Sequence, residues 1–397
     1  MSVVSFIEKL LDGDEVEWIS LEDIAHFQNA KPHEKLVSPD GDIALLTSKF
    51  ISTEGKSARW INKADVLTPA LENDVALVMS DLPNGRALAK AFFVTENDRY
   101  AANQRVCLLR VKDAECYSPK LLYYVMNRNR QLLAYDSGYD QTHLKKDWIL
   151  QVKIPIPCPN NPKKSLEIQA EIVRILDAFT AMTAELTTEL TARKKQYNYY
   201  RDQLLSFEEG EVEWKTLGEL AENLDSKRKP ITSGLRDVGK IPYYGASGIV
   251  DYVKDYIFDG DFLLVSEDGA NLLARNTPIA FSISGKTWVN NHAHVLKFDT
   301  YAERRYVEYY LNSIDLTPYI TGAAQPKLNK KNLESILIPN PSLLEKERIV
   351  SILDKFDALT SSITEGLPRE IELRQKQYEY YRDLLLSFPK PFSEVVV

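Results

Sequence analysis

The chain has 397 residues, 49 Lys and Arg against 57 Asp and Glu, and a formal charge of −8. This length exceeds one core and predicts two domains, and the 44% hydrophobic and 27% charged fractions exclude wholesale disorder. No apolar run approaches the roughly 20 residues of a membrane span, and the N-terminus lacks a signal-peptide pattern, so we expect a cytoplasmic protein with no membrane partner. Cys107, Cys116 and Cys158 contain no C-x-x-C and cannot all pair, which indicates reduced thiols.

The first element in chain order is a short stub, residues 1–18. Its end, Leu10–Trp18, finishes in the same Val-Glu-Trp as Leu204–Trp214, which follows a predicted long helix. The stub therefore copies the end of a helix whose body is missing at the N-terminus.

A first globular segment follows the stub. Its alternating apolar residues predict short strands at 75–79, 105–111 and 147–154. Tyr123 and Tyr124 lie on a predicted short helix. The proline-rich run Pro155–Pro159 ends the last strand, and Ser165 is a simple N-cap for the next helix.

The next element is a long helix that ends near Phe207. From Ile168 onward its apolar residues recur at alternating steps of four and three, as in a coiled-coil seam, with a stutter in the tandem tetrads of Thr183–Leu190. A helix of about 40 residues would span about 60 Å, which indicates a spacer. A helical hairpin that only dimerises or braces a core fits the same periodicity.

A second globular segment repeats the ends of the first but not its middle. Predicted strands lie at 262–266, 279–283 and 294–298. Thr321–Gln325 matches Ser137–Gln141, and Tyr309-Tyr310 matches Tyr123-Tyr124. Shared frames with divergent middles are expected of two modules that do the same job on different targets, although an ancient duplication that has drifted explains them too.

The second long helix repeats the first, since Ile349–Phe356 matches Ile172–Phe179 and Lys376–Phe388 matches Lys195–Phe207. Ser342 and Glu345 predict a capping box, and Gly366 with Pro368 predicts a kink or break. The stub placed beside the end of this helix would make the two halves equivalent in a closed, cyclic arrangement. Seam residues predicted to serve the spacer and subunit docking are Ile172, Phe179, Leu186, Leu190, Tyr197, Tyr200, Ile349, Phe356, Ile363, Tyr378 and Tyr381.

The net charge is unevenly distributed along the chain. The globular segments 19–164 and 215–340 carry +3 and 0, whereas the stub 1–18 and the helical parts 165–214 and 341–397 carry −4, −5 and −2. The acidic total alone disfavours nucleic acid, but the globular segments can still offer basic faces to a polyanion.

No catalytic or metal-binding motif is complete. Ser284–Thr287 resembles the end of a phosphate loop, but its first glycine is replaced by Ala280. His292 and His294 lack supporting ligands at a zinc-like spacing, and Pro39-Asp40 lacks the acid-x-Lys of a nuclease. The chain also has no G-x-S-x-G, H-E-x-x-H or Asn-Pro-Pro-aromatic motif. We therefore predict a protein that is not an enzyme and binds no metal.

Polar side chains suited to base edges occupy similar places in the two segments. Asn103-Gln104-Arg105 and Asn290-Asn291-His292 each stand just before a strand, where Asn and Gln can pair with adenine and Arg with guanine. Ordinary turn chemistry explains the same asparagines. Other loops combine charge with polar or aromatic groups, as phosphate positioning and base readout require. The predicted DNA-binding residues are Lys56, Arg59, Trp60, Asn103, Gln104, Arg105, Tyr139, Gln141, Thr142, His143, Lys145, Lys227, Arg228, Tyr243, Tyr244, Ser247, Asn290, Asn291, His292, Gln325 and Lys327.

The whole pattern resembles the specificity subunit of type I restriction-modification systems, and within it the type IC subgroup. The resemblance rests on the repeated helical motifs, on the tetrads of Thr183–Leu190 and on the Gly210–Trp214 linker, and it covers the whole chain in organisation. It implies an α+β fold with two similar target-recognition domains of short mixed strands and small helices. Two long antiparallel coiled-coil helices would separate these domains in a pseudo-twofold cyclic arrangement.

The resemblance and the repeat together predict the domain boundaries. They are an N-terminal stub near the C-terminal helix (1–18), target-recognition domain 1 (19–157), spacer helix 1 (158–207), target-recognition domain 2 (208–341), spacer helix 2 (342–390) and a tail (391–397).

The resemblance also implies a function. Each recognition domain would read one half of a bipartite double-stranded DNA target, and the helices would set the spacing and dock two modification subunits, which are adenine methyltransferases. This chain would bind no cofactor, whereas S-adenosylmethionine, ATP and Mg would be held by the modification and restriction subunits. The alternatives are a methylation-only specificity subunit without restriction partners and a coiled-coil scaffold that binds protein.

Overall fold

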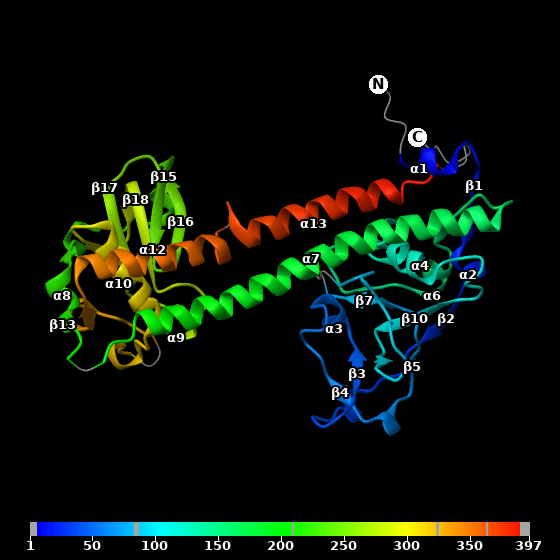
Figure 1. Cartoon of the computed structure of the whole chain (residues 1–397), viewed down its shortest axis with the longest axis horizontal. Coiled ribbons are helices and arrows are strands. Elements are labelled where there is room, and N and C mark those ends of the chain that lie inside the picture. The colour runs from blue at the N-terminus through cyan, green and yellow to red at the C-terminus, as the bar shows by residue number, and fades with distance from the viewer. Residues whose placement is uncertain (1–5, 83–86, 209, 323–324, 363, 390–397) are drawn as a thin grey trace. The chain divides into compact units, whose positions relative to one another are not determined.

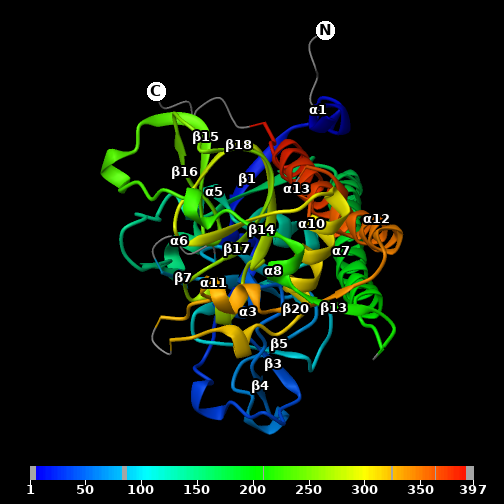
Figure 2. The same cartoon turned by 90° about the vertical axis from the view of Figure 1, so that its left-hand side faces the viewer.

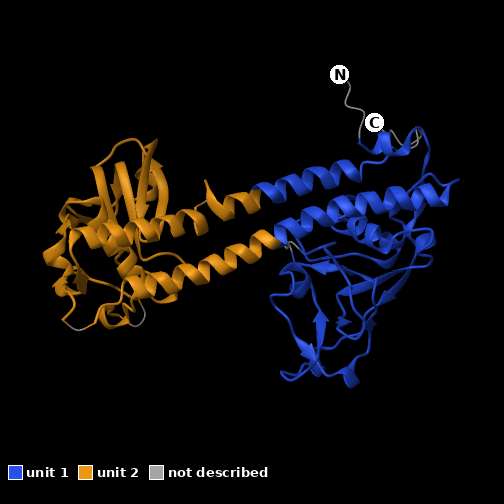
Figure 3. Ribbon diagram, in the orientation of Figure 1, with its two compact units in different colours: residues 1–184, 373–397 blue, residues 185–372 orange. Residues whose placement is uncertain are grey.

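The computed structural model describes residues 6–82, 87–208, 210–322, 325–362 and 364–389. The chain divides into two compact units, unit 1 with residues 1–184 and 373–397 and unit 2 with residues 185–372 (Figure 3). The division passes through the long helices, so each unit contains one globular segment and the adjoining helix ends. The predicted tail and Ile363 lie outside the described residues.

The globular part of unit 1 contains two four-stranded sheets. One has the order β2 (Ala25–Asn29), β10 (Val106–Val111), β6 (Val75–Val78), β8 (Ala91–Phe93), and all its pairs are antiparallel. The other has the order β4 (Trp60–Ile61), β3 (Ile43–Leu46), β9 (Tyr100–Ala102), β5 (Pro69–Ala70).

Strand β6 is buried on both faces because two cores meet there. Val75 and Leu77 face the core beneath helix α4 (Pro119–Met126), whereas Ala76 and Val78 face the core shared with the second sheet. This alternation is the two-residue period expected of a strand.

The globular part of unit 2 is built on one six-stranded sheet. Its order is β14 (Glu222–Asn223), β19 (Ala293–Lys297), β17 (Phe258–Ser266), β18 (Ala280–Val289), β15 (Val238–Gly245), β16 (Gly248–Val253). Helix α10 (Tyr301–Ser313), which starts with a capping box between Thr300 and Glu303, packs with the core face of β17.

Each globular segment begins and ends in the same two-stranded sheet. Strand β1 (Val16–Ser20) pairs with β12 (Lys153–Pro157) in unit 1, and β13 (Glu213–Thr216) pairs with β20 (Leu337–Asn340) in unit 2. Trp18 faces Pro155 and Trp214 faces Pro339, so the Val-Glu-Trp motif and the proline exit occupy the same register in both units.

Helix α7 (Pro162–Leu204) has 43 residues and runs without interruption (Figure 1). The prediction that Ser165 is its N-cap was wrong, because Asn161 caps the helix by accepting a hydrogen bond from the Lys164 backbone at 3.2 Å. Proline is tolerated at position 162, in the first turn of the helix, because a backbone N–H there would have no partner within the helix. Ser165 lies inside the helix and accepts a hydrogen bond from Gln169 at 3.1 Å.

The second helical part is broken where the sequence predicts it. Helix α12 (Leu343–Thr360) ends before α13 (Gly366–Leu385) begins, and Pro368 lies in the first turn of α13. The prediction that the long helices pair is confirmed within each unit. The Phe179 ring on α7 stacks on Tyr381 of α13 with centroids 5.2 Å apart, and Tyr200 stacks on Phe356 of α12 at 5.7 Å.

Matched aspartates on the repeated helical motifs anchor the globular segments. Asp177 on α7 accepts a hydrogen bond from the Tyr124 hydroxyl at 2.5 Å, and Asp354 on α12 accepts one from Tyr309 at 2.7 Å. Arg305 also pairs with Asp354 at 2.9 Å, which fixes α10 against α12 (Figure 2).

The N-terminal stub packs on the end of α13. Ile7 and Leu11 of helix α1 (Phe6–Leu11) share a buried cluster with Leu385 and Phe388, and the Trp18 indole donates a hydrogen bond to the Pro389 carbonyl at 2.9 Å. This is the contact that a closed, cyclic arrangement requires.

The prediction of a strand over residues 147–154 was wrong in its first half. Residues Lys146–Leu150 form helix α6, and the strand begins at Lys153. Ile149, Val152 and Ile154 are all buried, and such a short apolar run fits one helical turn as well as a strand. In the part of the chain that the structure describes, no helix is long and apolar enough to cross a membrane. The three cysteines are free.

Gly366 is required for the turn between α12 and α13, and we expect Gly366→Ala to destabilise unit 2. Its φ is +78°, and a Cβ would lie 2.3 Å from the Ala358 carbonyl oxygen. Gly210 is a matched control, since its φ is +87° but nothing lies within 4 Å of a Cβ there. Gly210→Ala should lower the free energy of unfolding only by the cost of a left-handed backbone, about 1–2 kcal/mol. Gly366→Ala should lower it by more, because its Cβ also clashes with the Ala358 carbonyl. Hydrogen exchange of the α12 amides measures the difference, and equal losses would contradict this account.

Candidate nucleic-acid interface

Four loops that lie far apart in the sequence converge in unit 1. The Asn103 backbone N–H donates to the Leu46 carbonyl at 3.2 Å, the Met79 N–H to the Arg105 carbonyl at 2.9 Å, and the Leu144 N–H to the Met79 carbonyl at 2.7 Å. The strand β7 (Ser80–Asp81) then pairs with β11 (Thr142–His143). Loops 46–48, 79–81, 103–105 and 141–145 therefore form one surface.

A cavity of about 610 Å³ opens on this surface. Arg59, Gln104 and Arg105, which the sequence predicts as DNA-binding residues, line it together with Lys49. The Asp81 carboxylate faces the same cavity but accepts hydrogen bonds from the backbone of Leu82 and Ala87, at 3.0 and 2.7 Å. The lining thus combines three cations with two carboxylates, Asp81 and Glu34, and Glu34 accepts a hydrogen bond from Gln104 at 3.1 Å.

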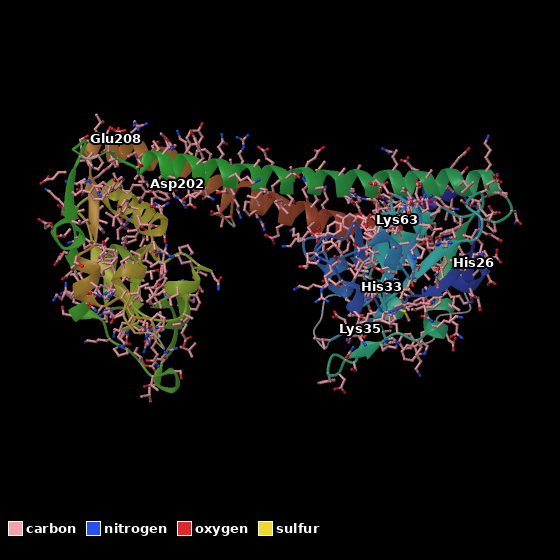
Figure 4. The ribbon with its side chains drawn as sticks, turned by 90° about the horizontal axis from the view of Figure 1, so that it is seen from below. His26, His33, Lys35, Lys63, Asp202 and Glu208 are labelled. Carbon is pink, nitrogen blue, oxygen red and sulfur yellow. The ribbon has the colours of Figure 1, made fainter. Side chains whose placement is uncertain are left out.

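Asn103 also lines the cavity, but its side chain serves the fold. It is 6% exposed, accepts a hydrogen bond from the His33 backbone at 3.0 Å and donates one to Glu34 at 2.8 Å. Burial acts to raise the pKa of Glu34, but the Asn103 amide and nearby charge hold that pKa below its ordinary value. His33 is fully buried inside unit 1 (Figure 4), and burial lowers the pKa of its ring.

The remaining predicted residues of unit 1 lie on its surface. Tyr139 is 87% exposed, and Lys56, Trp60 and His143 are exposed as well. The other three are held by neighbours, since Gln141 donates to the Ser80 hydroxyl at 2.9 Å, Thr142 donates to Asp136 at 3.2 Å and the Lys145 ammonium lies 5.0 Å above the Trp148 ring.

Four loops of unit 2 converge through the same kind of backbone hydrogen bonds. The Asn290 N–H donates to the Tyr244 carbonyl at 3.0 Å, the Glu267 N–H to the His292 carbonyl at 2.9 Å, and the Leu328 N–H to the Glu267 carbonyl at 2.8 Å. Loops 244–247, 266–268, 290–292 and 325–328 therefore form one surface.

The two surfaces share one backbone frame. The Met79 N–H donates to Arg105 and the Met79 carbonyl accepts from Leu144. In the same way, the Glu267 N–H donates to His292 and the Glu267 carbonyl accepts from Leu328. A serine closes each frame as well, since the Ser48 hydroxyl donates to the Ser80 carbonyl at 3.3 Å and the Ser266 hydroxyl to the Ala246 carbonyl. Asn103 and Asn290, both 6% exposed, begin equivalent turns. The side chains on this frame differ almost completely between the units.

Some predicted residues of unit 2 point outward from this frame and others support it. Lys227, Ser247, Asn291, His292, Gln325 and Lys327 are exposed. The Asp268 carboxylate lies 2.9 Å from the exposed His292 ring. Tyr244 is half-buried and packs against Phe281.

Three other predicted residues are occupied within the fold. The Tyr243 ring is 1% exposed and its hydroxyl accepts a hydrogen bond from the Ile231 backbone at 2.9 Å. Asn290 accepts one from the His292 backbone at 2.8 Å, and Arg228 is paired with Glu267 at 2.6 Å. Their residue types suit DNA, but their burial could not be read from a single sequence.

The cluster of Asp225, Glu267 and His294 has the composition of a metal site, but its ligand atoms are already used. Arg228 and Lys327 occupy the Glu267 carboxylate at 2.6 and 3.0 Å, and Asp225 accepts from His294 at 2.6 Å. Two cations beside the carboxylates oppose a third, and a histidine that donates from both nitrogens offers no lone pair.

Sequence reasoning missed the loops that complete each frame. Lys49, Asp81 and Leu82 line the cavity of unit 1, and Asp268 faces the surface of unit 2. Each follows a strand end, which is a weak signal by itself. The match between loops 46–48 and 244–247 has no counterpart in their residues and is visible only in the hydrogen bonds.

The residues predicted for spacer and docking divide into two groups. Ile172 and Ile349 are fully buried in the cores of their units, so they fix the helices and offer no surface to a partner. The other described members, Phe179, Leu186, Leu190, Tyr197, Tyr200, Phe356, Tyr378 and Tyr381, are partly exposed along the helices.

A second cavity in unit 1, of about 440 Å³, lies where the stub, β12 and the end of α13 meet. Its lining includes Trp18, Arg128, Arg130, Lys153 and Arg382. Asp383, also in the lining, pairs with Arg130 and Arg382. Positive charge therefore dominates this cavity.

Two modules with one backbone frame, divergent surface residues and attachment to paired long helices define a class of recognition proteins, and the comparisons identify it. The family "Type I restriction modification DNA specificity domain" matches residues 13–194 and 209–373. In Escherichia coli, the type I restriction enzyme EcoR124I/EcoR124II specificity subunit is 40% identical over 98% of this chain and 99% of its own length. The EcoprrI specificity subunit, from the same organism, is 36% identical over 92% and 93%.

A solved structure agrees with the fold. The crystal structure of the type I restriction-modification S subunit from M. genitalium superposes with a TM-score of 0.61 at 16% identity, covering 96% of this chain and 98% of that one. The chain therefore belongs to the type I restriction-modification DNA specificity family. The predicted family and the predicted α+β fold with two recognition domains and paired long helices are confirmed.

The buried asparagine of the unit 2 turn should matter more to stability than its exposed neighbour. Asn290→Ala removes the acceptor for the His292 N–H and should cost about 1–3 kcal/mol locally. Asn291→Ala, one residue away on the surface, should change stability by no more than about 0.5 kcal/mol. Hydrogen exchange of the β19 amides should be faster in Asn290→Ala than in Asn291→Ala. Equal protection in the two variants would show that Asn290 does not stabilise this turn.

Proposed function

We propose that this chain is the non-catalytic DNA sequence-specificity subunit of a type I restriction-modification complex, and that each unit reads one half of a bipartite duplex target. The observation that carries the proposal is the shared four-loop frame with different exposed side chains. Two copies of one scaffold that present different donors and acceptors are suited to read two different sequences.

The exposed groups on each frame have the chemistry of base and phosphate recognition. In unit 1, the Arg105 guanidinium fits the two acceptors of guanine, and Gln104, which donates to Glu34 at 3.1 Å, keeps its amide oxygen as an acceptor. In unit 2, Asn291 and Gln325 present amides. Lys327 is 51% exposed beside Glu267, and its ammonium keeps N–H donors for a phosphate. Asn103, Arg228, Tyr243 and Asn290 are excluded from the contact set because their polar groups are engaged within the fold.

The long helices would set the distance between the half-sites and dock the modification subunits. Tyr199 and Tyr380 occupy the same position of the repeat and are 62% and 66% exposed, although large aromatic side chains on a helix surface normally pack. A matched exposed pair suits two copies of one partner. The basic cavity of unit 1, beside the end of α13, offers a further docking site for a modification subunit. S-adenosylmethionine would be held by the modification subunits, and ATP and Mg by restriction subunits.

The decisive experiment is sequencing of methylated adenines in a host that carries this gene with its modification subunits. Two short specific sequences separated by a fixed nonspecific spacer are expected. Methylation at an undivided sequence would overturn the proposal. If the reconstituted complex shows no salt-dependent affinity for duplex DNA, the chain is a protein-binding scaffold instead.

Arg105→Ala should relax only the half-site read by unit 1. Loss of a bidentate contact to guanine is expected to cost about 1–3 kcal/mol of discrimination at one base pair. Arg99→Ala is the matched control, because Arg99 is an exposed arginine of the same unit that pairs with Glu96 and lies outside the four loops. Selection of methylated duplexes from a randomised library reports each position. Equal relaxation by both variants would exclude Arg105 as a base-reading residue.

Deletion of Thr187–Leu190 should shorten the nonspecific spacer of the target by about two base pairs. Four helical residues span about 6 Å and make little more than one turn, so the deletion shortens the helix and nearly preserves its faces. Two base pairs at about 3.4 Å each match that length. The control, Thr188→Ala, keeps the helix length and should keep the spacer. Methylome sequencing measures both, and an unchanged spacer after deletion would disprove the relation.

A further inference from the structure

A network of charged side chains lies directly beneath the four-loop surface of unit 2. His294 is fully buried, and the side chains of Asp225, Glu267 and Arg228 are 8%, 11% and 12% exposed. Lys327, which is 51% exposed, closes the network at the surface through Glu267. Charges so far from water persist only when each is paired and hydrogen-bonded.

The hydrogen bonds define the protonation of the His294 ring. Its Nδ1 lies 2.6 Å from the Asp225 carboxylate and its Nε2 lies 2.7 Å from the Leu328 carbonyl oxygen. A carbonyl and a carboxylate are both acceptors, so both ring nitrogens donate. A neutral imidazole has one N–H and can make only one of these bonds. The ring is therefore an imidazolium.

The imidazolium holds one of the four loops. The Leu328 N–H donates to the Glu267 carbonyl at 2.8 Å, and the Leu328 carbonyl accepts from His294. Leu328 is thus fixed on both sides, and it immediately follows the exposed Lys327 and the loop that carries Gln325. Arg228 secures the adjoining turn by donating to the Ala293 carbonyl at 2.8 Å.

Unit 1 supports its equivalent loop without ions. The strand position that corresponds to His294 is Cys107, and Met79 corresponds to Glu267. Cys107 is fully buried and Met79 is 5% exposed, so at these two positions unit 1 has apolar packing where unit 2 has ions. The two units therefore hold the same loop by different physical means.

We propose that His294 is a positioning residue for the second recognition surface, and that reading of one half-site, but not the other, depends on the two hydrogen bonds of its buried ring. The inference rests on the proposed function. The charged groups that face the ring are Asp225 from the loop after β14, Glu267 from the end of β17, and Arg228 and Lys327 through those carboxylates. His292, two residues before His294, is turned to Asp268 at 2.9 Å.

The carboxylates keep the network charged at neutral pH. Burial acts to raise the pKa of Asp225 and of Glu267, but His294 at the first, and Arg228 and Lys327 at the second, hold both pKa values below the ordinary range. Depressed carboxyl pKa values stabilise the fold above the unfolded-state pKa, and this contribution is lost as the pH falls through the folded-state pKa.

The test uses the full chain in complex with its modification subunits and a randomised duplex library. His294→Gln removes the charge and the two-sided donation, and should reduce discrimination at the half-site of unit 2 by roughly tenfold, the equivalent of one charge-assisted hydrogen bond. Discrimination at the half-site of unit 1, identified by its response to Arg105→Ala, should not change. The control His26→Gln alters an exposed histidine outside the four loops, and should leave discrimination at both half-sites unchanged.

Hydrogen exchange in the His294→Gln complex provides a second test that separates positioning from a folding defect. Faster exchange of the Leu328 amide is expected, with the β17 and β18 amides as protected as in the unmodified complex. Loss of protection throughout unit 2 would contradict a positioning role.

The possible outcomes separate this proposal from the proposed function. A target without two half-sites overturns the proposed function itself. A bipartite target whose two halves respond equally, or not at all, to His294→Gln leaves the proposed function standing and overturns the role of His294.

Discussion

The recognition surfaces depend on one constraint, which is that a loop must expose its side chains while its backbone polar groups remain paired. An unpaired buried N–H or carbonyl costs about as much as a lost hydrogen bond, so a loop cannot be displayed at random. Met79 and Glu267 meet this constraint by pairing their N–H with one loop and their carbonyl with another. These links at Met79 and Glu267 use main-chain atoms alone, so they tolerate almost any residue on the outer side of the frame. Divergence of the exposed residues is the expected consequence.

The same separation of roles applies to the attachment of the domains. Asp177 and Asp354 stand at the same position of the helical repeat and each receives a tyrosine hydroxyl from its globular segment. Trp18 and Trp214 face equivalent prolines where the segments enter and leave the helices. Side chains specify these contacts, so the aspartates, tryptophans and prolines recur. The links at Met79 and Glu267 are specified by backbone atoms, and these two residues differ. Residues therefore repeat between the two halves where a side chain makes the contact, and they diverge where backbone atoms make it.

This distinction explains how much was predictable. The helices α7, α12 and α13, their pairing and the break near Gly366 follow from apolar periodicity and from one glycine, both of which are local signals. The strands around Leu77, Leu264 and Val295 follow from runs buried on both faces. The turns at Asn103 and Asn290 were also located, yet both asparagines face inward, because a polar residue that caps a turn and one that reads a base are the same in sequence. Convergence of the four loops could not be predicted, since it depends on backbone hydrogen bonds between residues at least 25 positions apart whose identities are unconstrained.

Unit 2 supports its backbone frame with buried charged side chains, whereas unit 1 has apolar side chains at the corresponding positions. An apolar support, such as Cys107 and Met79 in unit 1, acts through volume and is indifferent to pH. An ionic support acts through geometry, since the His294 ring holds Leu328 only along the direction of its N–H. Desolvation makes such a network costly, and removal of one member leaves the others unpaired. The ionic network of unit 2 fixes the conformation of the loop above it, but the buried residues of the network tolerate few substitutions. New specificities should therefore arise in unit 2 through the exposed positions, whereas the apolar support of unit 1 also allows change from below through repacking.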